Sequence, residues 1–264
     1  MNFNNKTIWI TGASSGIGEA CAYLLAKENA NLILTALETD LLVKVQEKCT
    51  SLGGKCEILP YDLSDIEGIP MLVEKALNLF GLVDIMYNNA GISQRAKVAD
   101  TLFEVDKKIM DINFFAPVRI SKLLIPQMIE NGGGTFVTTT SISGRFGFPL
   151  RSAYCSSKHA LYGFFETIHA EYFGQNIRCV MVCPGRVKTN ISFYALEKSG
   201  KQHGKLDAGQ AGGISVDKAA KKIVKAIRKQ KPEVLVGSKE LLMVYFKRFI
   251  PALNRKIARN IKPE

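Results

Sequence analysis

Short apolar runs alternate with helix-length segments along the chain, and this alternation constrains the fold more than any other feature. Such runs, rich in Val and Ile and lacking polar alternation, are typical of strands buried on both faces of a parallel sheet. The pattern predicts an α/β fold with a doubly wound (Rossmann-type) parallel sheet, whose ligands bind at the carboxyl ends of the strands. We expect strands at 6–11, 31–36, 56–60, 83–88, 134–140, 177–183 and 233–237, and helices at 17–29, 40–52, 65–80, 101–130, 152–174 and 216–230.

The chain suits one domain with two less regular segments. Its 264 residues, 47% hydrophobic and 22% charged, can bury a full core, so we expect a single α/β domain over 1–264. The stretch 186–214 follows a predicted strand and is rich in Gly, Lys and Ser, and a loop of that length predicts a lid or substrate loop. Residues 238–264 form a basic amphipathic tail beyond the last predicted strand.

The formal net charge of +11 lies entirely in the C-terminal segment. Residues 1–217 hold 21 basic and 21 acidic residues, whereas 218–264 hold 14 basic and 3 acidic ones. The charge therefore gives no sign that the bulk of the domain binds nucleic acid or anionic substrates, and no nucleic-acid partner is expected. The tail at 240–261 mixes apolar and basic residues around Pro251. It suits docking on its own domain, covering a neighbouring subunit, or peripheral contact with an anionic membrane surface.

Neither a targeting signal nor a membrane-spanning run is visible in the sequence. The N-terminus enters a strand-like run without the basic flank and apolar segment of a signal peptide, and no run reaches the ~20 apolar residues of a spanning helix. The six cysteines lack C-x-x-C spacing and a nearby His, so we expect reduced thiols, without a metal site or a disulfide framework. A cytoplasmic protein is expected.

A glycine-rich turn, "TGASSGIG" at 11–18, joins the first predicted strand to the first helix. Gly12, Gly16 and Gly18 let the backbone turn tightly and approach a pyrophosphate, whose charge is met by free N–H groups at the helix N-terminus. The G-x-x-x-G-x-G spacing differs from the usual G-x-G-x-x-G, but it lies between strand and helix, where phosphate binding requires it. The turn predicts a dinucleotide site.

A second motif, "YCSSK", places Tyr154 and Lys158 four residues apart on one face of a predicted helix. By itself such a pair is most often a solvated helix face. An ammonium about 4 Å from a phenol contributes up to ~4 kcal/mol at an effective dielectric of about 20, on the order of three pKa units, so Lys158 can poise Tyr154 as an acid or base. Ser141, just after a predicted strand, could hold a substrate oxygen beside the phenol.

In combination these motifs resemble the short-chain dehydrogenase/reductase family over about 5–237, and within it the hydroxysteroid-dehydrogenase-like branch of the member 7B type. The resemblance rests on "TGASSGIG", "NNAG" at 88–91, an Asn in the fourth helix, "SISG", "YCSSK" and Pro184-Gly185. It implies an NAD(P)-dependent oxidoreductase that transfers a hydride between a nicotinamide and a ketone or secondary alcohol, and a homo-oligomer, dimer or tetramer. The implied catalytic residues are Asn113, Ser141, Tyr154 and Lys158, with Asn113 in a water relay to Lys158.

The resemblance also implies the cofactor contacts. These would be Gly12, Ser14, Ser15, Ile17 and Gly18 in the glycine-rich turn, Asp62 and Leu63 at the adenine, Asn89, Ala90 and Gly91 after the fourth strand, Tyr154 and Lys158 at the nicotinamide ribose, and Val187 and Thr189 over the nicotinamide. Asp62 has a second interpretation as a helix-capping residue, because "DLSD" is a helix-start signal, and the two roles are compatible.

The end of the second predicted strand, "TALETD", departs from the family's pattern. NAD-dependent members usually place Asp where Ala36 stands, and many NADP-dependent members place Arg where Leu37 stands or a basic residue where Ser15 stands. The missing Asp favours NADP, whereas Glu38 would oppose a 2′-phosphate if it pointed inward. The sequence therefore leans to NADP as the cofactor.

Substrate specificity is expected in 186–214 and in 92–98. The long loop holds a group of apolar residues that either receive a hydrophobic, lipid-like substrate or pack the loop onto the domain. They are Ile191, Phe193, Tyr194, Ala195 and Leu196. A non-catalytic dinucleotide-binding regulator or membrane-surface protein on the same fold is the alternative to an enzyme, and the presence of the Ser, Tyr and Lys favours the enzyme.

Overall fold

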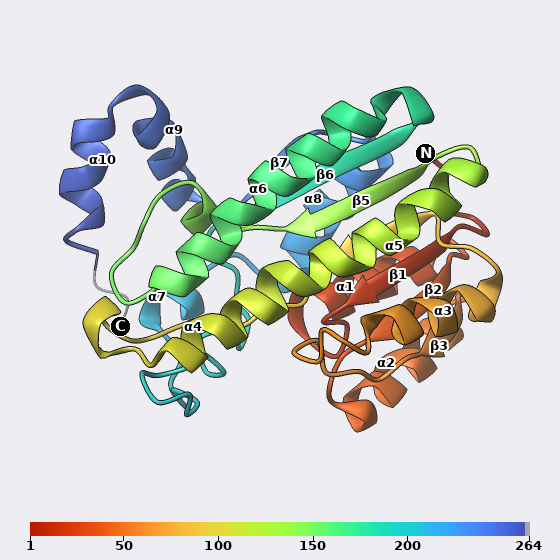
Figure 1. Ribbon diagram of the computed structural model, residues 1–264, viewed down its shortest axis with the longest axis horizontal. Helices are drawn as coiled ribbons and strands as arrows, with labels where there is room; N and C mark the ends of the chain where they lie inside the picture. Colours follow the sequence, from red (N-terminus) through yellow and green to blue (C-terminus); the bar gives the residue numbers. More distant parts are fainter. Residues whose placement is uncertain (262–264) are drawn as a thin grey trace.

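The computed structural model describes residues 1–261 and contains a sheet of seven strands (Figure 1). The strands are β1 (Thr7–Thr11), β2 (Asn31–Thr35), β3 (Lys55–Ile58), β4 (Ile85–Asn88), β5 (Gly134–Thr139), β6 (Ile177–Pro184) and β7 (Glu233–Val236). They run parallel in the order β3-β2-β1-β4-β5-β6-β7. The predicted doubly wound parallel sheet is confirmed.

Helices cover both faces of the sheet. One face carries α1 (Gly16–Ala26), α2 (Thr39–Ser51) and α8 (Val216–Arg228), and the other carries α3 (Ile69–Phe80), α5 (Ala116–Glu130) and α6 (Ser152–Tyr172). Alternate residues of a strand point to opposite faces, so Ile8 and Ile10 lie in the first core and Trp9 lies in the second. The Trp9 indole N–H donates to Thr35 Oγ1 at 2.9 Å, which satisfies its polar atom in the interior.

The order of the strands reverses between β1 and β4. From β1 the chain steps outward to β2 and β3, and it then returns to the other side of β1 to form β4. In doubly wound folds the ligand lies at this switch point, beyond the carboxyl ends of the strands. The glycine-rich turn follows β1 and the segment 88–91 ends β4, so the fold brings two of the predicted cofactor motifs together.

Two predicted helices differ from expectation. The segment 101–130 forms α4 (Phe103–Met110), a π-helical turn (Asp111–Phe115) and then α5, instead of one regular helix. The helix predicted at 65–80 begins only at Ile69, because two aspartates hold a turn before it. Asp62 Oδ1 accepts the Ser64 N–H at 2.9 Å, and Asp65 Oδ1 accepts the Gly68 N–H at 3.1 Å. Asp62 thus caps this turn and not the helix.

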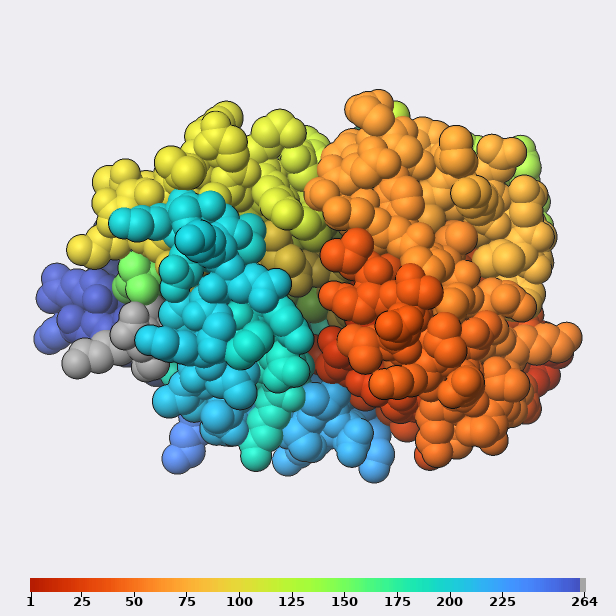
Figure 2. All heavy atoms as spheres, turned by 90° about the horizontal axis from the view of Figure 1, so that it is seen from below, coloured from red at the N-terminus to blue at the C-terminus, as the bar shows by residue number. Residues whose placement is uncertain are grey.

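The predicted substrate loop, 186–214, is folded back on the domain. Isolated bridges join Gln94 to Leu196, Leu196 to Gln202 and Val187 to Ile214, and the short helix α7 (Ala208–Ala211) lies near its end. In Figure 2 this segment (cyan) forms one side of a hollow, and the N-terminal part of the chain (red) forms the other. Short 3-10 turns lie at Val98–Asp100, Ile142–Gly144, Phe173–Gln175 and Lys239–Leu241.

The tail forms two helices, α9 (Leu242–Phe249) and α10 (Pro251–Ala258). Pro251 is the first residue of α10, a position that suits proline because no N–H is needed there. In Figure 1 this pair (blue) lies at the opposite end of the molecule from α2 and α3. Residues 262–264 of the predicted tail lie outside the described residues. Within 1–261, no helix combines the length and the apolar character required to cross a bilayer.

Candidate active site

The glycine-rich turn after β1 has a backbone that only glycine adopts easily. Gly12 and Gly16 have φ angles of +63° and +62°, in the left-handed region. A Cβ on Gly12 would lie 2.8 Å from the Ala90 Cα, and a Cβ on Gly18 would lie 2.3 Å from the Gly12 carbonyl oxygen. The glycines therefore let the turn, the start of α1 and the end of β4 pack closely, and they leave the first N–H groups of α1 at the switch point.

Thr11 joins the two cofactor motifs, a role that the sequence did not assign to it. Its Oγ1 accepts the N–H groups of Asn89 at 3.1 Å and of Ala90 at 3.2 Å. In return, Asn89 Nδ2 donates to the carbonyl oxygens of Thr11 and Gly12, each at 3.1 Å. Thr11 is the first residue of the glycine-rich motif, which could have drawn attention to it. Its hydrogen-bond partners, however, lie far along the chain and cannot be found from local sequence.

Asn113 is fully buried in the π-helical turn between α4 and α5. Such turns are rare and often mark functional sites. Its Oδ1 accepts the Ile92 N–H at 2.8 Å, and its Nδ2 donates to the Ile92 carbonyl at 2.9 Å and to Ser157 Oγ at 3.1 Å. A Cβ on Gly91 would meet Asn113 Oδ1 at 3.0 Å and Lys158 Nζ at 3.3 Å, so Gly91 fits closely between these side chains.

Tyr154 and Lys158 lie near the start of α6 and are both buried, so the motif is not a solvated helix face. Lys158 Nζ donates to the Thr139 carbonyl at 2.8 Å, at the carboxyl end of β5. The ammonium is 5.9 Å from the centre of the Tyr154 ring. Burial lowers the pKa of Lys158 to about 8.

In the structure, burial has the largest effect on the pKa of Tyr154, and its direction is opposite to that expected from the Lys158 charge. Burial raises the pKa of the Tyr154 phenol, and this effect outweighs the nearby Arg151 charge and the Ser141 hydroxyl, which both lower it. Arg95 also lowers this pKa. The ammonium of Lys158 is instead turned to the Thr139 carbonyl, as the hydrogen bond shows. The phenol therefore keeps its proton at neutral pH.

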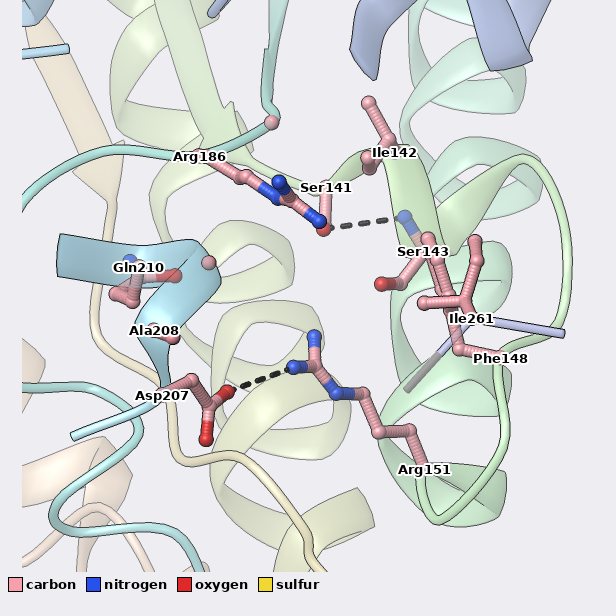
Figure 3. A pocket seen from close by; sticks show the side chains of 12 residues that line it. Ser141, Ile142, Ser143, Phe148, Arg151, Arg186, Asp207, Ala208, Gln210 and Ile261 are labelled. Atoms are coloured by element: carbon pink, nitrogen blue, oxygen red, sulfur yellow. Dashed lines mark hydrogen bonds and ion pairs between the residues drawn. The ribbon is translucent and has the colours of Figure 1, made fainter. Parts of the chain in front are cut away.

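Ser141 begins the 3-10 turn after β5 and lies beside Tyr154. Its Oγ accepts the Ser143 N–H at 3.1 Å and donates weakly to the Pro184 carbonyl at 3.5 Å. A cavity of about 380 Å³ opens at this hydroxyl and reaches Arg151 on α6, Arg186 after β6, and Asp207 (Figure 3). A substrate in this cavity would meet Ser141 at its wall.

Three of the predicted cofactor residues have contacts that bear on binding. Ser14 Oγ donates to Glu38 Oε2 at 3.0 Å, and Ser15 is exposed at the start of α1. Thr189 Oγ1 accepts from Gln210 Nε2 at 3.1 Å, and Gln210 Nε2 also donates to the carbonyl of the buried Val187. A Cβ on Gly16 would lie 3.3 Å from Thr189 Cγ2, so the loop after β6 approaches the glycine-rich turn.

The remaining predicted contacts are divided between surface and core. Ile17 is half-buried on α1, and Asp62 is exposed. Leu63 is only 7% exposed and packs in the core under α3, α5 and α6, which leaves its main chain rather than its side chain for an adenine. The glycine-rich cradle, the free start of α1 and the hollow in Figure 2 together fit a dinucleotide.

Comparisons with known proteins agree with this geometry. A family model described as short chain dehydrogenase matches residues 6–200. The chain is 37% identical to the dehydrogenase/reductase SDR family protein 7-like of Drosophila melanogaster, over 93% of this chain and 76% of that protein. It is 38% identical to dehydrogenase/reductase SDR family member 7B of Xenopus laevis, over 92% and 78% of the two chains, and 36% identical to that of Mus musculus, over 94% and 79%.

A solved structure shows the same fold. The crystal structure of a short chain dehydrogenase/reductase from Burkholderia phymatum in complex with NAD matches with a TM-score of 0.84 and 21% identity, covering 100% of this chain and 98% of that chain. Because the family model and the relatives match most of the chain, it belongs to the short-chain dehydrogenase/reductase family of NAD(P)-dependent oxidoreductases, in the branch that contains member 7B.

Proposed function

We propose that the protein interconverts a ketone and a secondary alcohol, with Tyr154 as the residue that exchanges the proton. The observation that carries this proposal is the meeting of four side chains beside the glycine-rich turn, from three separate segments of the chain: Ser141, Asn113, and Tyr154 with Lys158. A bound nicotinamide supplies or accepts the hydride. The side chains of the protein orient the substrate oxygen and move its proton.

In the reducing direction, the Ser141 hydroxyl donates a hydrogen bond to the carbonyl oxygen and polarises it. The Tyr154 phenol then gives its proton to this oxygen, and its raised pKa keeps that proton available at neutral pH. Lys158, with a pKa of about 8, is mostly protonated at pH 7 and stabilises the phenolate that remains. Asn113 acts as a positioning residue, because it ties Ile92 to Ser157, whose hydroxyl donates to the Tyr154 carbonyl at 2.9 Å.

The contact between Ser14 and Glu38 bears on the choice of cofactor. The missing Asp at position 36 favours NADP, but Glu38 turns its carboxylate to the glycine-rich turn, where it accepts from Ser14. A carboxylate there would repel a 2′-phosphate and could accept a hydrogen bond from a 2′-hydroxyl. On this contact we assign the preference to NAD(H), against the lean of the sequence.

The apolar residues of the 186–214 loop support a lipid-like substrate only weakly. Ala195 and Leu196 are buried, and Leu196 packs with Val105 and Ile109. Phe193 and Tyr194 are 38% and 48% exposed and lie edge to face. Two of the five residues therefore pack the loop onto the domain, and the two aromatic residues stay available for a hydrophobic substrate at the surface.

Turnover separates the enzyme from the alternative, a non-catalytic regulator on the same fold. Purified protein would be incubated with NADH or NADPH and a panel of aldehydes, ketones and secondary alcohols, and nicotinamide absorbance would be followed. Turnover of any carbonyl that Tyr154→Phe abolishes supports the proposal. Tight cofactor binding without turnover across the panel would instead favour the regulator.

The tail supports a peripheral membrane contact. Leu242, Tyr245 and Phe249 of α9 are exposed at spacings that place them on one side of the helix, with Phe249 75% exposed. Lys247 and Arg248 of α9 are exposed as well. Apolar residues beside basic ones suit an interfacial helix on an anionic bilayer. We propose this contact for a protein that otherwise works in the cytoplasm.

A homo-oligomer remains a proposal from the family. Phe103 of α4, Phe115 of the π-helical turn and Leu123 of α5 are 76%, 45% and 39% exposed, which leaves apolar surface for a second copy. Light scattering on a size-exclusion column would give the mass, and a purely monomeric protein would contradict the proposal.

A further inference from the structure

The cavity beside Ser141 is unusually rich in arginine for a substrate site expected to be apolar. Arg151 and Arg186 both line it, together with one carboxylate, Asp207 (Figure 3). Arg95 lies buried behind Asp207. These residues come from the loop after β4, the start of α6, the loop after β6 and the start of α7, so the fold and not local sequence gathers them.

Asp207 is already neutralised by one of these arginines. Arg95 faces it with two nitrogens: Nε donates to Oδ1 at 3.2 Å, and a terminal nitrogen pairs with Oδ2. Their side chains are only 3% and 5% exposed, so this is a closed internal ion pair. Arg151 donates to the same Oδ2 at 3.1 Å, but the charge of this carboxylate is already neutralised by Arg95. Two positive charges, on Arg151 and Arg186, are left at the cavity wall.

Within residues 1–261, the charges around Arg186 do not cancel this excess. Among the residues that the structure describes, its guanidinium forms no ion pair or hydrogen bond. Glu240 is close, but its Oε1 accepts the main-chain N–H groups of Arg186 and Ser238 at 2.8 and 3.0 Å, and it does not line the cavity. In Figure 3 the Arg186 side chain extends across the cavity toward Ser141. Within residues 1–261, the Arg186 guanidinium therefore has no polar partner and can bind a ligand.

Two buried donors at this wall lack partners among residues 1–261. Arg151 Nε and Ser143 Oγ form no hydrogen bond with the described residues, although Ser143 is only 1% exposed. The Cys155 thiol is close to the Ser143 hydroxyl, but a thiol is a weak partner and no hydrogen bond of normal geometry forms. Buried polar groups are normally paired, and a positive charge beside unpaired donors is the composition of an oxyanion site. Burial and the neighbouring Arg95 also lower the pKa of Arg151, which an anion would reverse.

We propose that this cavity is an anion subsite, in which Arg151, Arg186 and Ser143 bind a carboxylate or phosphate group of the carbonyl substrate. The inference rests on the proposed function, because Ser141 belongs to the same cavity and fixes where the carbonyl lies. The substrate is then a ketone with an oxyanion a few bonds from the reacting carbon. The sequence did not indicate this site, because the net charge of residues 1–217 is zero while the charge at the cavity wall is positive.

Matched substrate pairs test the proposal with the complete protein and its nicotinamide cofactor. Levulinate would be compared with methyl levulinate, and hydroxyacetone phosphate with hydroxyacetone. We expect kcat/KM for at least one charged ketone to exceed that of its neutral partner by about tenfold or more, the effect of one charge-assisted hydrogen bond. The pair with the larger ratio tells a carboxylate from a phosphate.

Two variants test whether the cavity residues cause the preference for charged over neutral ketones. Arg186→Gln should reduce the ratio of charged to neutral substrate to about one, mainly through KM, and Ser143→Ala should reduce it by about threefold or more. Arg119→Gln is the matched control. Arg119 lies on α5, away from the cavity, and pairs with Glu67, so its replacement should leave the ratio unchanged. A ratio near one in the wild-type protein, or an equal loss for all four substrates in Arg186→Gln, would overturn the subsite.

A binding measurement keeps this inference separate from the proposed function. If no substrate is turned over, the thermal midpoint of the protein with bound nicotinamide would be measured against inorganic phosphate. A rise in the wild-type protein that Arg186→Gln removes supports the anion subsite and leaves only the reaction in question. An equal response of both proteins shows an adventitious ion only and overturns the subsite.

Discussion

Asn113 holds the main chain of Ile92 at both of its polar groups: Oδ1 accepts the N–H at 2.8 Å, and Nδ2 donates to the carbonyl at 2.9 Å. The same Nδ2 reaches Ser157 one turn from Tyr154. A single buried side chain in a π-helical turn thereby fixes the segment after β4 against α6. Asn113 thereby sets the distance between the cofactor motif that ends β4 and helix α6, which holds Tyr154 and Lys158.

Replacing Asn113 by Ala should lower both stability and turnover. The Ile92 N–H and carbonyl would lose their partners in a largely buried place, which costs about 2–4 kcal/mol of the free energy of unfolding. Urea unfolding followed by circular dichroism would give the loss. Asn131→Ala, which removes an exposed Asn at the end of α5, is the control and should cost less than about 1 kcal/mol. A fully stable and active Asn113→Ala protein would contradict the positioning role.

Tyr154→Phe should retain nicotinamide binding and lower kcat by about 10²–10⁴-fold, because the proton donor is lost while the cofactor site is intact. Fluorescence titration would measure binding, and nicotinamide absorbance would measure turnover. Tyr172→Phe, at the far end of the same helix, is the matched control and should keep its activity. Wild-type turnover by Tyr154→Phe would rule out the assignment of the proton donor.

Lys158→Met should stabilise the protein at neutral pH while it abolishes turnover. The pKa of Lys158 falls from 10.5 to about 8 in the folded protein, so the unfolded chain binds more protons between these values. The folded state therefore bears a penalty that is full below pH 8 and is relieved as pH rises toward 10.5. Allowing for the lost bond to Thr139, we expect the variant to be more stable by about 1–3 kcal/mol at pH 7.

The difference between wild type and Lys158→Met should shrink as pH rises, because other titrating groups are common to both proteins and cancel. Urea unfolding at pH 7, 8, 9 and 10 would show this. Lys44→Met, at an exposed position of α2, should leave the free energy of unfolding within about 0.5 kcal/mol at every pH. A constant difference for Lys158→Met would mean that burial does not shift this pKa.

Glu38→Gln should raise the affinity for NADPH relative to NADH by about tenfold or more, because it removes the negative charge that we propose lies near the ribose 2′ position. Titration of both cofactors by nicotinamide fluorescence would give the two dissociation constants. Asp40→Asn removes a charge two residues away on the exposed start of α2 and should leave their ratio unchanged. Tighter binding of NADPH than NADH by the wild-type protein would contradict the NAD(H) assignment and support the NADP preference expected from the sequence.

Phe249→Glu should weaken binding to vesicles that contain phosphatidylserine by roughly tenfold, since it replaces a large apolar contact by a charge that the surface repels. Co-sedimentation is the measurement. Point substitution is preferable to removing the tail, because Met243 and Ala258 pack with Phe146 and Cys183 in a buried cluster. Val98→Glu, at an equally exposed position (75%), is the control, and equal losses by both variants would exclude a specific role for α9.

The sequence by itself determined the order of strands and helices along the chain and the parallel sheet, and it marked the residues that we propose to be catalytic. Hydrophobic periodicity is local, so short apolar runs report strands buried on both faces wherever they occur. Glycine-rich turns and the spacing of Tyr154 and Lys158 are local as well. Local sequence could not predict the π-helical turn around Asn113, because Asn113 is held there by Ile92 and Ser157, which are distant in sequence.

Only the tertiary structure decided the electrostatics of the site. The inward turn of Glu38 depends on Ser14, the direction of Lys158 depends on the Thr139 carbonyl, and the raised pKa of Tyr154 depends on its burial. The charged wall of the cavity combines Arg151 and Arg186 with a pair that joins residues 95 and 207. A net charge sums over the whole chain, whereas Coulomb energy and desolvation depend on the distance and burial of particular groups, and these follow only from how the chain crosses itself in space.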